Sequence, residues 1–123
     1  MNENEIIAQS ILFFAAGFET TASTISHAIF EFTKHPEVQE KLHCEVMEAL
    51  QDIDPEDLST YYDTITNHIP YLDAVIKETL RKYPVAARLS RRVGVDNYDL
   101  KGIHLKRDDI IEVSTIGVHY DEK

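Results

Sequence analysis

Several features that commonly reveal a protein's chemistry are scarce or absent in this sequence. A single cysteine, Cys44, cannot form an internal disulfide, which favours a reducing compartment. The six histidines show neither a His-Glu-x-x-His pattern nor paired cysteine spacing, which argues against a zinc site. Also lacking are a glycine-rich phosphate loop and a Gly-x-Ser-x-Gly elbow. The common metal, nucleotide and serine-hydrolase signatures are therefore not present.

Basic residues are also few, because 12 lysines and arginines face 22 acids and give a net charge of −10. Such an acidic balance argues against nucleic-acid binding. The bases are nevertheless concentrated in one short span whose only acid is Glu78, and an anionic partner could dock there. They are Lys77, Arg81, Lys82, Arg88, Arg91 and Arg92.

No apolar run is long enough to span a bilayer, which requires roughly 20 residues. The longest run begins at Ile11 and has eight apolar or glycine residues before Glu19. The opening residues have no basic region, so we expect no signal peptide, targeting segment or membrane anchor in this chain. The abrupt ending after a strand-like run predicts a piece of a longer protein.

The stretch Ile11–Thr24 organises the rest of the chain. An all-apolar helix is wrapped by protein on every side, so the pattern predicts a core helix with Glu19 buried among partners. Gly17 and the β-branched Thr20 weaken the helix there, and the Thr20 hydroxyl can bond the carbonyl of Ala16. Together these residues predict a helix opened beside a ligand. The alternative is an ordinary glycine-containing helix whose Glu19 reaches the surface.

Hydrophobic spacing and proline positions predict a mainly α chain with a small antiparallel β ribbon. A long helix capped by Asn2 or Asn4 runs to about Thr33. The other expected elements are a helix from Pro36 to about Leu50, a turn at 51–55, a short helix or loop at 58–66, a helix from Pro70 to Tyr83, strands at 93–98 and 110–114, and a helix or loop at 115–119. No linker divides residues 1–123, so we expect a single partial domain.

The helix that starts at Pro70 carries Glu78-x-x-Arg81, whose side chains share a face and can form a charge-assisted pair. Taken with the first helix, this sequence resembles the cytochrome P-450 family of haem-thiolate monooxygenases. The resemblance rests on Ala16-Gly17-Phe18-Glu19-Thr20-Thr21 and Glu78-Thr79-Leu80-Arg81. It also rests on their order with His35-Pro36-Glu37 and Arg88-Leu89-Ser90-Arg91-Arg92, and it covers essentially all residues. Phe-Glu-Thr-Thr and Lys-Tyr-Pro are similar to the animal microsomal branch.

The resemblance implies a role for each matching residue. Thr20 would hydrogen-bond dioxygen or its water and Glu19 would relay protons, while Ala16 and Gly17 would flank the haem. Glu78 and Arg81 would be structural residues on the thiolate side. Arg91 is the first choice for a haem propionate contact, with Arg88 and Arg92 as rivals, and residues 85–89 would line the substrate pocket.

The resemblance also implies a parent enzyme that inserts one oxygen atom of O2 into a small apolar xenobiotic or lipid. It would draw electrons from NADPH through a reductase partner and lie on the cytoplasmic face of the endoplasmic reticulum membrane, held by an N-terminal anchor outside this chain. The family's cysteine loop, which supplies the iron ligand, is absent from this sequence, so the fragment alone is expected to be inactive. The alternative is a non-catalytic helical binding module.

Overall fold

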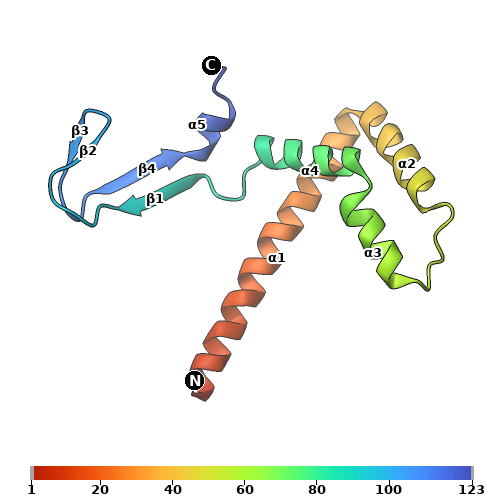
Figure 1. The fold of residues 1–123 in the computed structure, drawn as a ribbon, viewed down its shortest axis with the longest axis horizontal. Coiled ribbons are helices and arrows are strands. Elements are labelled where there is room, and N and C mark those ends of the chain that lie inside the picture. Colours follow the sequence, from red (N-terminus) through yellow and green to blue (C-terminus); the bar gives the residue numbers. More distant parts are fainter. Residues whose placement is uncertain (1, 123) are drawn as a thin grey trace. The chain divides into compact units, whose positions relative to one another are not determined.

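The computed structural model describes residues 2–122, and their contacts divide the chain into two compact units. The first unit ends at Tyr83 and is helical, whereas the second begins at Pro84 and is built mainly from short strands. Figure 1 labels the elements of both units. The prediction of a mainly α chain with a small antiparallel β part is confirmed.

The first helix, α1, runs without a break over Glu3–Lys34. Asn2 is its N-cap: the Asn2 side chain accepts from Glu5 N, and the Glu5 carboxylate accepts from Asn2 N, each over 2.9 Å. This reciprocal pair is a capping box. The predicted helix and its cap are therefore confirmed, but the predicted opening of the helix near Gly17 is not seen.

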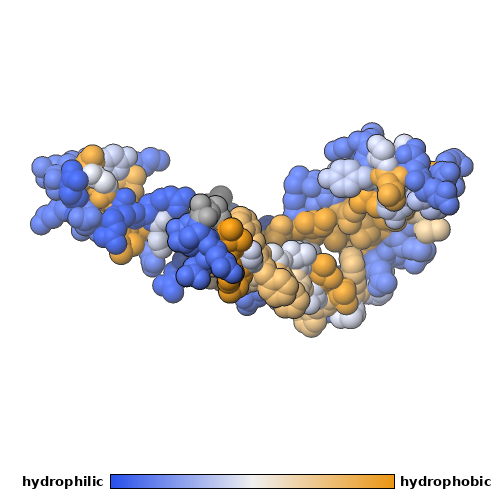
Figure 2. Space-filling model, turned by 90° about the horizontal axis from the view of Figure 1, so that it is seen from below, coloured by the Kyte–Doolittle hydropathy of each residue, from blue (hydrophilic) through white to orange (hydrophobic). Residues whose placement is uncertain are grey.

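The surroundings of α1 differ from the prediction of a core helix. Phe13, Phe14 and Phe18 are 75%, 74% and 67% exposed, and α1 has no buried residue. Figure 2 shows apolar side chains at the molecular surface along this helix. The physical reason is the position of its contacts: α1 meets α2 and α4 in the first unit, and its ring and hydrogen-bond contacts with the end of α4 come from His27 and Glu31, near its C-terminal end. The apolar segment before them stays exposed. By length and mean hydropathy α1 could also cross a membrane, although core helices of soluble proteins share these features.

Three further helices complete the first unit: α2 (Pro36–Leu50), α3 (Leu58–Asn67) and α4 (Pro70–Lys82). Proline occupies the first position of α2 and of α4, where a missing N–H costs nothing. Both carboxylate oxygens of Glu45 on α2 accept from Tyr71 N at the start of α4, over 3.0 and 3.4 Å. The small core lies among these helices and buries Ile69, Thr64 and Thr79.

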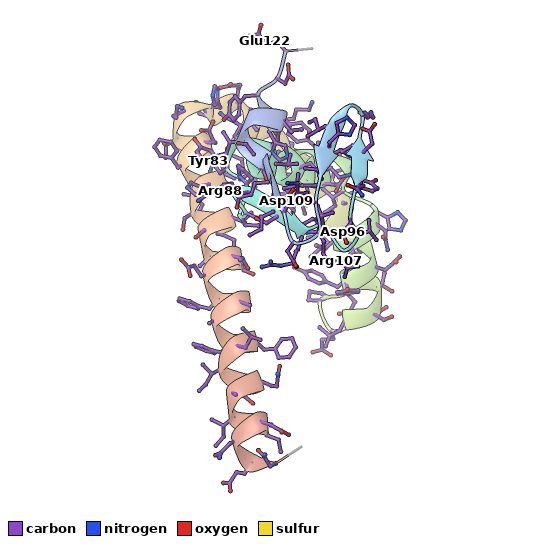
Figure 3. The ribbon with its side chains drawn as sticks, turned by 90° about the vertical axis from the view of Figure 1, so that its left-hand side faces the viewer. Tyr83, Arg88, Asp96, Arg107, Asp109 and Glu122 are labelled. Atoms are coloured by element: carbon purple, nitrogen blue, oxygen red, sulfur yellow. The ribbon has the colours of Figure 1, made fainter. Side chains whose placement is uncertain are left out.

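The second unit contains two antiparallel pairs of strands and a short helix. β1 (Arg88–Arg92) pairs with β4 (Ile110–Ser114), β2 (Tyr98–Leu100) pairs with β3 (Ile103–Leu105), and α5 (Thr115–His119) follows β4. The β2–β3 connection is a two-residue turn, and both Lys101 and Gly102 have positive φ, of 51° and 92°. Figure 3 shows Asp96 beside Arg107, and an ion pair of 3.4 Å joins them.

One predicted strand is wrong. The sequence predicts a strand over residues 93–98, but the strand that pairs with β4 is the preceding arginine-rich run, β1. Val93 continues the pairing beyond β1, because its N–H donates to Asp109 O and its carbonyl accepts from Asp108 N, each over 2.9 Å. The chain then turns at Asn97, which has φ of 55°. A left-handed backbone at this position breaks an extended strand.

Candidate functional site

The residues expected to flank a ligand lie midway along α1. Residues three and four apart share a helix face, so Ala16, Glu19 and Thr20 lie together and Gly17 borders them. All four are exposed. The Thr20 hydroxyl donates to Ala16 O over 2.7 Å, as the sequence predicts. A Cβ added to Gly17 would meet nothing within 4 Å, so this face is open.

The sequence predicts a buried Glu19, and in this chain Glu19 is exposed. The reason is the same as for the phenylalanines: the contacts of α1 with the end of α4 are made by His27 and Glu31, which lie further toward the C-terminal end of α1. Glu31, which forms an ion pair with Lys82 at the end of α4, lies 12 residues after Glu19. The two residues are therefore about 18 Å apart along the helix, at 1.5 Å per residue. The alternative of a surface carboxylate therefore describes Glu19 in this chain.

The Glu78–Arg81 pair forms on α4. Arg81 donates from Nε and Nη2 to the two carboxylate oxygens of Glu78, both over 2.7 Å. This fork-to-carboxylate geometry fixes both planes. The hydrogen bonds from Arg81 lower the pKa of Glu78 more than desolvation raises it, so the carboxylate is held charged. Both side chains keep about half of their surface exposed, at 55% for Glu78 and 43% for Arg81.

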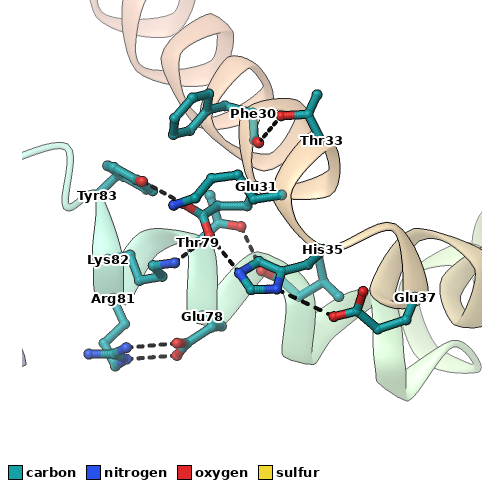
Figure 4. Close-up of polar contacts among 12 residues, drawn as sticks. Phe30, Glu31, Thr33, His35, Glu37, Glu78, Thr79, Arg81, Lys82 and Tyr83 are labelled. Atoms are coloured by element: carbon teal, nitrogen blue, oxygen red, sulfur yellow. Dashed lines mark hydrogen bonds and ion pairs between the residues drawn. The ribbon is translucent and has the colours of Figure 1, made fainter.

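A second charged cluster lies between α1 and α4 and was not anticipated from the sequence (Figure 4). Its centre is Glu31, whose side chain is only 13% exposed. Tyr83 donates its hydroxyl to Oε1 over 2.6 Å, and Lys82 Nζ bonds Oε2. Lys34 Nζ lies 3.5 Å from Oε1 and His35 Nε2 lies 3.8 Å from Oε2. The bonds from Lys82 and Tyr83 lower the pKa of Glu31 to about 2.

The three arginines near β1 differ in their partners. Arg88 Nη1 lies 3.4 Å from Glu112 Oε2, and Arg92 Nη1 lies 3.7 Å from Asp108 Oδ1. Arg91 Nη1 donates to the carbonyl of Ser90 over 2.8 Å, and among the described residues it has no ion pair. Side chains alternate along a strand, so Arg91 leaves the sheet on the face of Leu89, opposite to that of Arg88 and Arg92. Its register partner on β4 is Ile111.

Among residues 2–122 no three histidine, cysteine or acidic side chains gather in a way that would hold a metal ion. Cys44 is exposed on α2, and its Sγ lies 3.8 Å from Glu40 Oε1. The structure thus groups Ala16, Gly17, Glu19 and Thr20 on α1, and Glu78 with Arg81 on α4. Arg88 and Arg91 belong to the second unit.

The sequence is similar to known proteins along its whole length. The sequence profile described as Cytochrome P450 matches residues 1–123. The chain belongs to the cytochrome P450 family. It is 42% identical over 125 residues to Cytochrome P450 6B5 of Papilio glaucus, covering 100% of this chain and 25% of that relative. It is 38% identical over 123 residues to Cytochrome P450 3A13 of Mus musculus, covering 100% of this chain and 23% of the relative.

This P450 chain therefore spans about a quarter of the length of the curated relatives it matches. The family implies a haem. Each unit, taken by itself, carries residues whose chemistry is compatible with one. Ala16 and Gly17 leave one face of α1 without bulk, in an apolar stretch that no described element of the first unit covers. Arg91 offers a guanidinium that has no acid partner in the described chain. Cys44 is the single cysteine of this sequence that could supply a thiolate to the iron, and its place on α2 beside Glu40 does not suit that role.

Proposed function

We propose that this P450 chain is a segment of a haem-dependent monooxygenase that inserts one atom of O2 into a small apolar substrate. The observation that carries the proposal is the match of the whole chain to the family. The Ala16–Thr21 stretch and the Glu78–Arg81 pair lie within the matched residues. When bound, the haem supplies oxygen activation and insertion. The 123 residues alone are proposed to bind haem poorly and to be inactive.

Four residues of α1 are proposed to act beside the haem: Thr20 and Glu19 in proton delivery, and Ala16 and Gly17 in leaving room for the ring. The Thr20 hydroxyl donates to Ala16 O in this structure, one turn back along α1. Released from that carbonyl, it would donate a hydrogen bond to dioxygen or water bound at this face. Glu19, on the same face, exchanges protons with water and passes them to Thr20. The small side chains of Ala16 and Gly17 allow a flat ring to approach the helix backbone.

The remaining residues hold the cofactor and the fold. Arg91 binds a haem propionate, because a planar guanidinium matches a carboxylate and this one has no competing acid in the described chain. Arg88 and Arg92 are weaker candidates because each already has an acidic partner. Glu78 and Arg81 stabilise the thiolate side. Residues 85–89 line the substrate pocket; Val85 and Leu89 are 57% and 52% exposed, which leaves them available.

The parent enzyme is proposed to receive electrons from NADPH through a reductase. It is further proposed to lie on the cytoplasmic face of the endoplasmic reticulum membrane, as an enzyme of the animal microsomal branch would; the relatives named above come from animals. An anchor segment outside this chain would hold it there. The proposed substrates are xenobiotics or lipids, because the uncovered part of α1 is apolar.

One observation favours a second candidate, a non-catalytic helical binding module. Glu19 and the Glu78–Arg81 pair are all solvent-accessible in this chain, as a module without a haem would have them. The decisive experiment is to sequence the source transcript on both sides of this segment. A downstream haem loop with a cysteine supports the monooxygenase, and expression of that reading frame should give a haem-loaded protein. A stop codon directly after Lys123 would overturn catalysis for this product.

A further inference from the structure

The carboxylate of Glu31 joins two helices that carry different parts of the proposed site. It lies on the last turns of α1, and its two strongest partners, Lys82 and Tyr83, lie at the end of α4. Each partner donates to a different oxygen of the carboxylate: the Tyr83 hydroxyl donates to Oε1 and Lys82 Nζ donates to Oε2. Bonds to both oxygens fix the rotation of the carboxylate as well as its position.

Tyr83 is held by α1 at a second point. Its ring stacks on that of His27, with centroids 4.3 Å apart and planes inclined by 4°. His27 lies four residues before Glu31, so both side chains leave the same face of α1. Residues on two successive turns of α1 therefore contact the Tyr83 side chain. These contacts restrict sliding and rotation of the end of α4 relative to α1.

Because Glu31 is mostly buried, its charged contacts matter more for the local structure than an exposed ion pair on α4 does. Its side chain is 13% exposed, whereas both partners of the Lys77–Asp73 pair on α4 are at least 60% exposed. Ion pairs on an open surface contribute little because water screens them. A carboxylate that is mostly removed from water depends on its bonded partners, so losing them changes the local structure.

The Glu31 cluster borders the same groove as Glu78. This groove has a volume of about 340 Å³, and Glu31, Lys82 and Glu78 all line it. Glu78 lies one turn before Lys82 on α4, as Figure 4 shows. Any movement of the last turn of α4 away from Glu31 would therefore carry Glu78 and Arg81 with it.

We propose that Glu31 is a positioning residue: through Lys82 and Tyr83 it fixes the last turn of α4, and with it the Glu78–Arg81 pair, against α1. This inference rests on the proposed function, since it gives the cluster the task of keeping the helix of Glu19 and Thr20 in register with the helix of Glu78 and Arg81. Glu31 itself touches neither substrate nor haem.

The test uses hydrogen–deuterium exchange and haem retention in the parent enzyme. Glu31→Gln removes the charge and keeps the size, and Tyr83→Phe removes one hydroxyl and keeps the ring stack. In both variants we expect amide exchange across residues 79–83 to rise by roughly tenfold, as for loss of a contact between packed residues. Glu37→Gln is the matched control, because Glu37 also contacts His35, over 3.3 Å, but its side chain is 70% exposed. It should change exchange by less than about twofold.

Haem retention after gel filtration separates a positioning role from a purely structural contact. Because the contacts of Glu31 with Lys82 and Tyr83 are weakened, the Glu31→Gln variant should retain several-fold less haem. The Soret band of its ferrous–carbonyl form should also shift or split. Faster amide exchange with unchanged haem retention and spectrum would overturn the positioning role. Unchanged amide exchange at residues 79–83 would show that Glu31 does not fix the last turn of α4. A wild-type parent that binds no haem would instead overturn the proposed function, because the exchange measurement does not require haem. If Glu31→Gln does not fold, Tyr83→Phe provides the same two readouts.

Discussion

The hydroxyl of Tyr83 donates a 2.6 Å hydrogen bond to Oε1 of Glu31, across a separation of 52 residues in the chain. A bond between residues so distant in sequence closes a long loop, and it forms only when α1 and α4 are already packed. It therefore reports on the tertiary structure of the first unit. Its loss can be measured without any assumption about catalysis.

The first prediction concerns acid stability. The pKa of Glu31 is about 2 in the folded chain, well below its ordinary value of 4.5, because Lys82 and Tyr83 bond the charged form. A lowered pKa stabilises the folded state at pH values above 4.5, and this contribution is lost as the pH falls toward 2. We expect the free energy of unfolding to decrease over that interval, as measured by urea titrations at several pH values.

Glu31→Gln serves as the comparison for that series. Asp57, Asp63 and Glu78 also have lowered pKa values, so the wild-type curve contains their contributions as well. The difference between the wild-type and Glu31→Gln curves isolates Glu31. It should be largest near neutral pH and shrink as the pH approaches 2. Parallel curves with a constant offset would contradict the assignment.

The second prediction concerns the small core of the first unit. Ile69 precedes α4 and is only 3% exposed, so Ile69→Ala should lower the free energy of unfolding by about 2–5 kcal/mol through lost burial and a cavity. Ile69→Val should cost about 0.5–1.5 kcal/mol. Ile76, on α4 and 43% exposed, gives the control: Ile76→Ala should cost clearly less. Equal losses at both positions, in urea unfolding monitored by circular dichroism, would show that Ile69 is not central to this core.

Local signals were sufficient to predict α1, α2 and α4, whereas α3 and α5 were each expected as a helix or a loop. Pro36 and Pro70 stand at the first positions of α2 and α4, and Asn2 with Glu5 begins α1, so each boundary is specified by nearby residues. The Thr20 bond to Ala16 is equally local, since it spans one turn. The Glu78–Arg81 pair was predictable for the same reason.

Features that depend on distant partners were not predictable. The run Arg88–Arg92 is too polar to be read as a strand, and it becomes one because β4 pairs with it. Burial of α1 depends on which elements cover it, and in this chain partial burial begins only at residue 23. The Glu31 cluster was missed because its partners are 51 and 52 residues away. The one available signal was an acid on the apolar stripe of α1, one turn before His35.

The third prediction distinguishes the arginines of β1 in the haem-loaded parent. Arg91→Gln should raise the haem dissociation rate by roughly tenfold or more, because a hydrogen bond to a charged group contributes about 1.5–3 kcal/mol. Arg88→Gln should leave that rate near the wild-type value and lower the free energy of unfolding by less than about 1 kcal/mol, since it removes only the exposed pair with Glu112. Transfer of haem to an apo-globin acceptor measures the rate. If Arg88→Gln raises the haem dissociation rate more than Arg91→Gln does, the propionate contact is made by Arg88 and the assignment to Arg91 is wrong.

The last prediction tests Thr20 in the parent enzyme. Thr20→Ala removes the hydroxyl that bonds Ala16 O, and we expect the product formed per NADPH oxidised to fall by roughly tenfold or more, while NADPH consumption continues. Thr20→Ser keeps a hydroxyl and should largely restore the ratio. Thr24 is the matched control, because its hydroxyl donates to Thr20 O over 2.9 Å in the same way, one turn further along α1. If Thr24→Ala lowers the ratio as much as Thr20→Ala, the effect belongs to helix α1 in general and the proton-delivery role of Thr20 is wrong. A loss confined to Thr20→Ala would place the proton path at the face that Thr20 shares with Glu19 and Ala16.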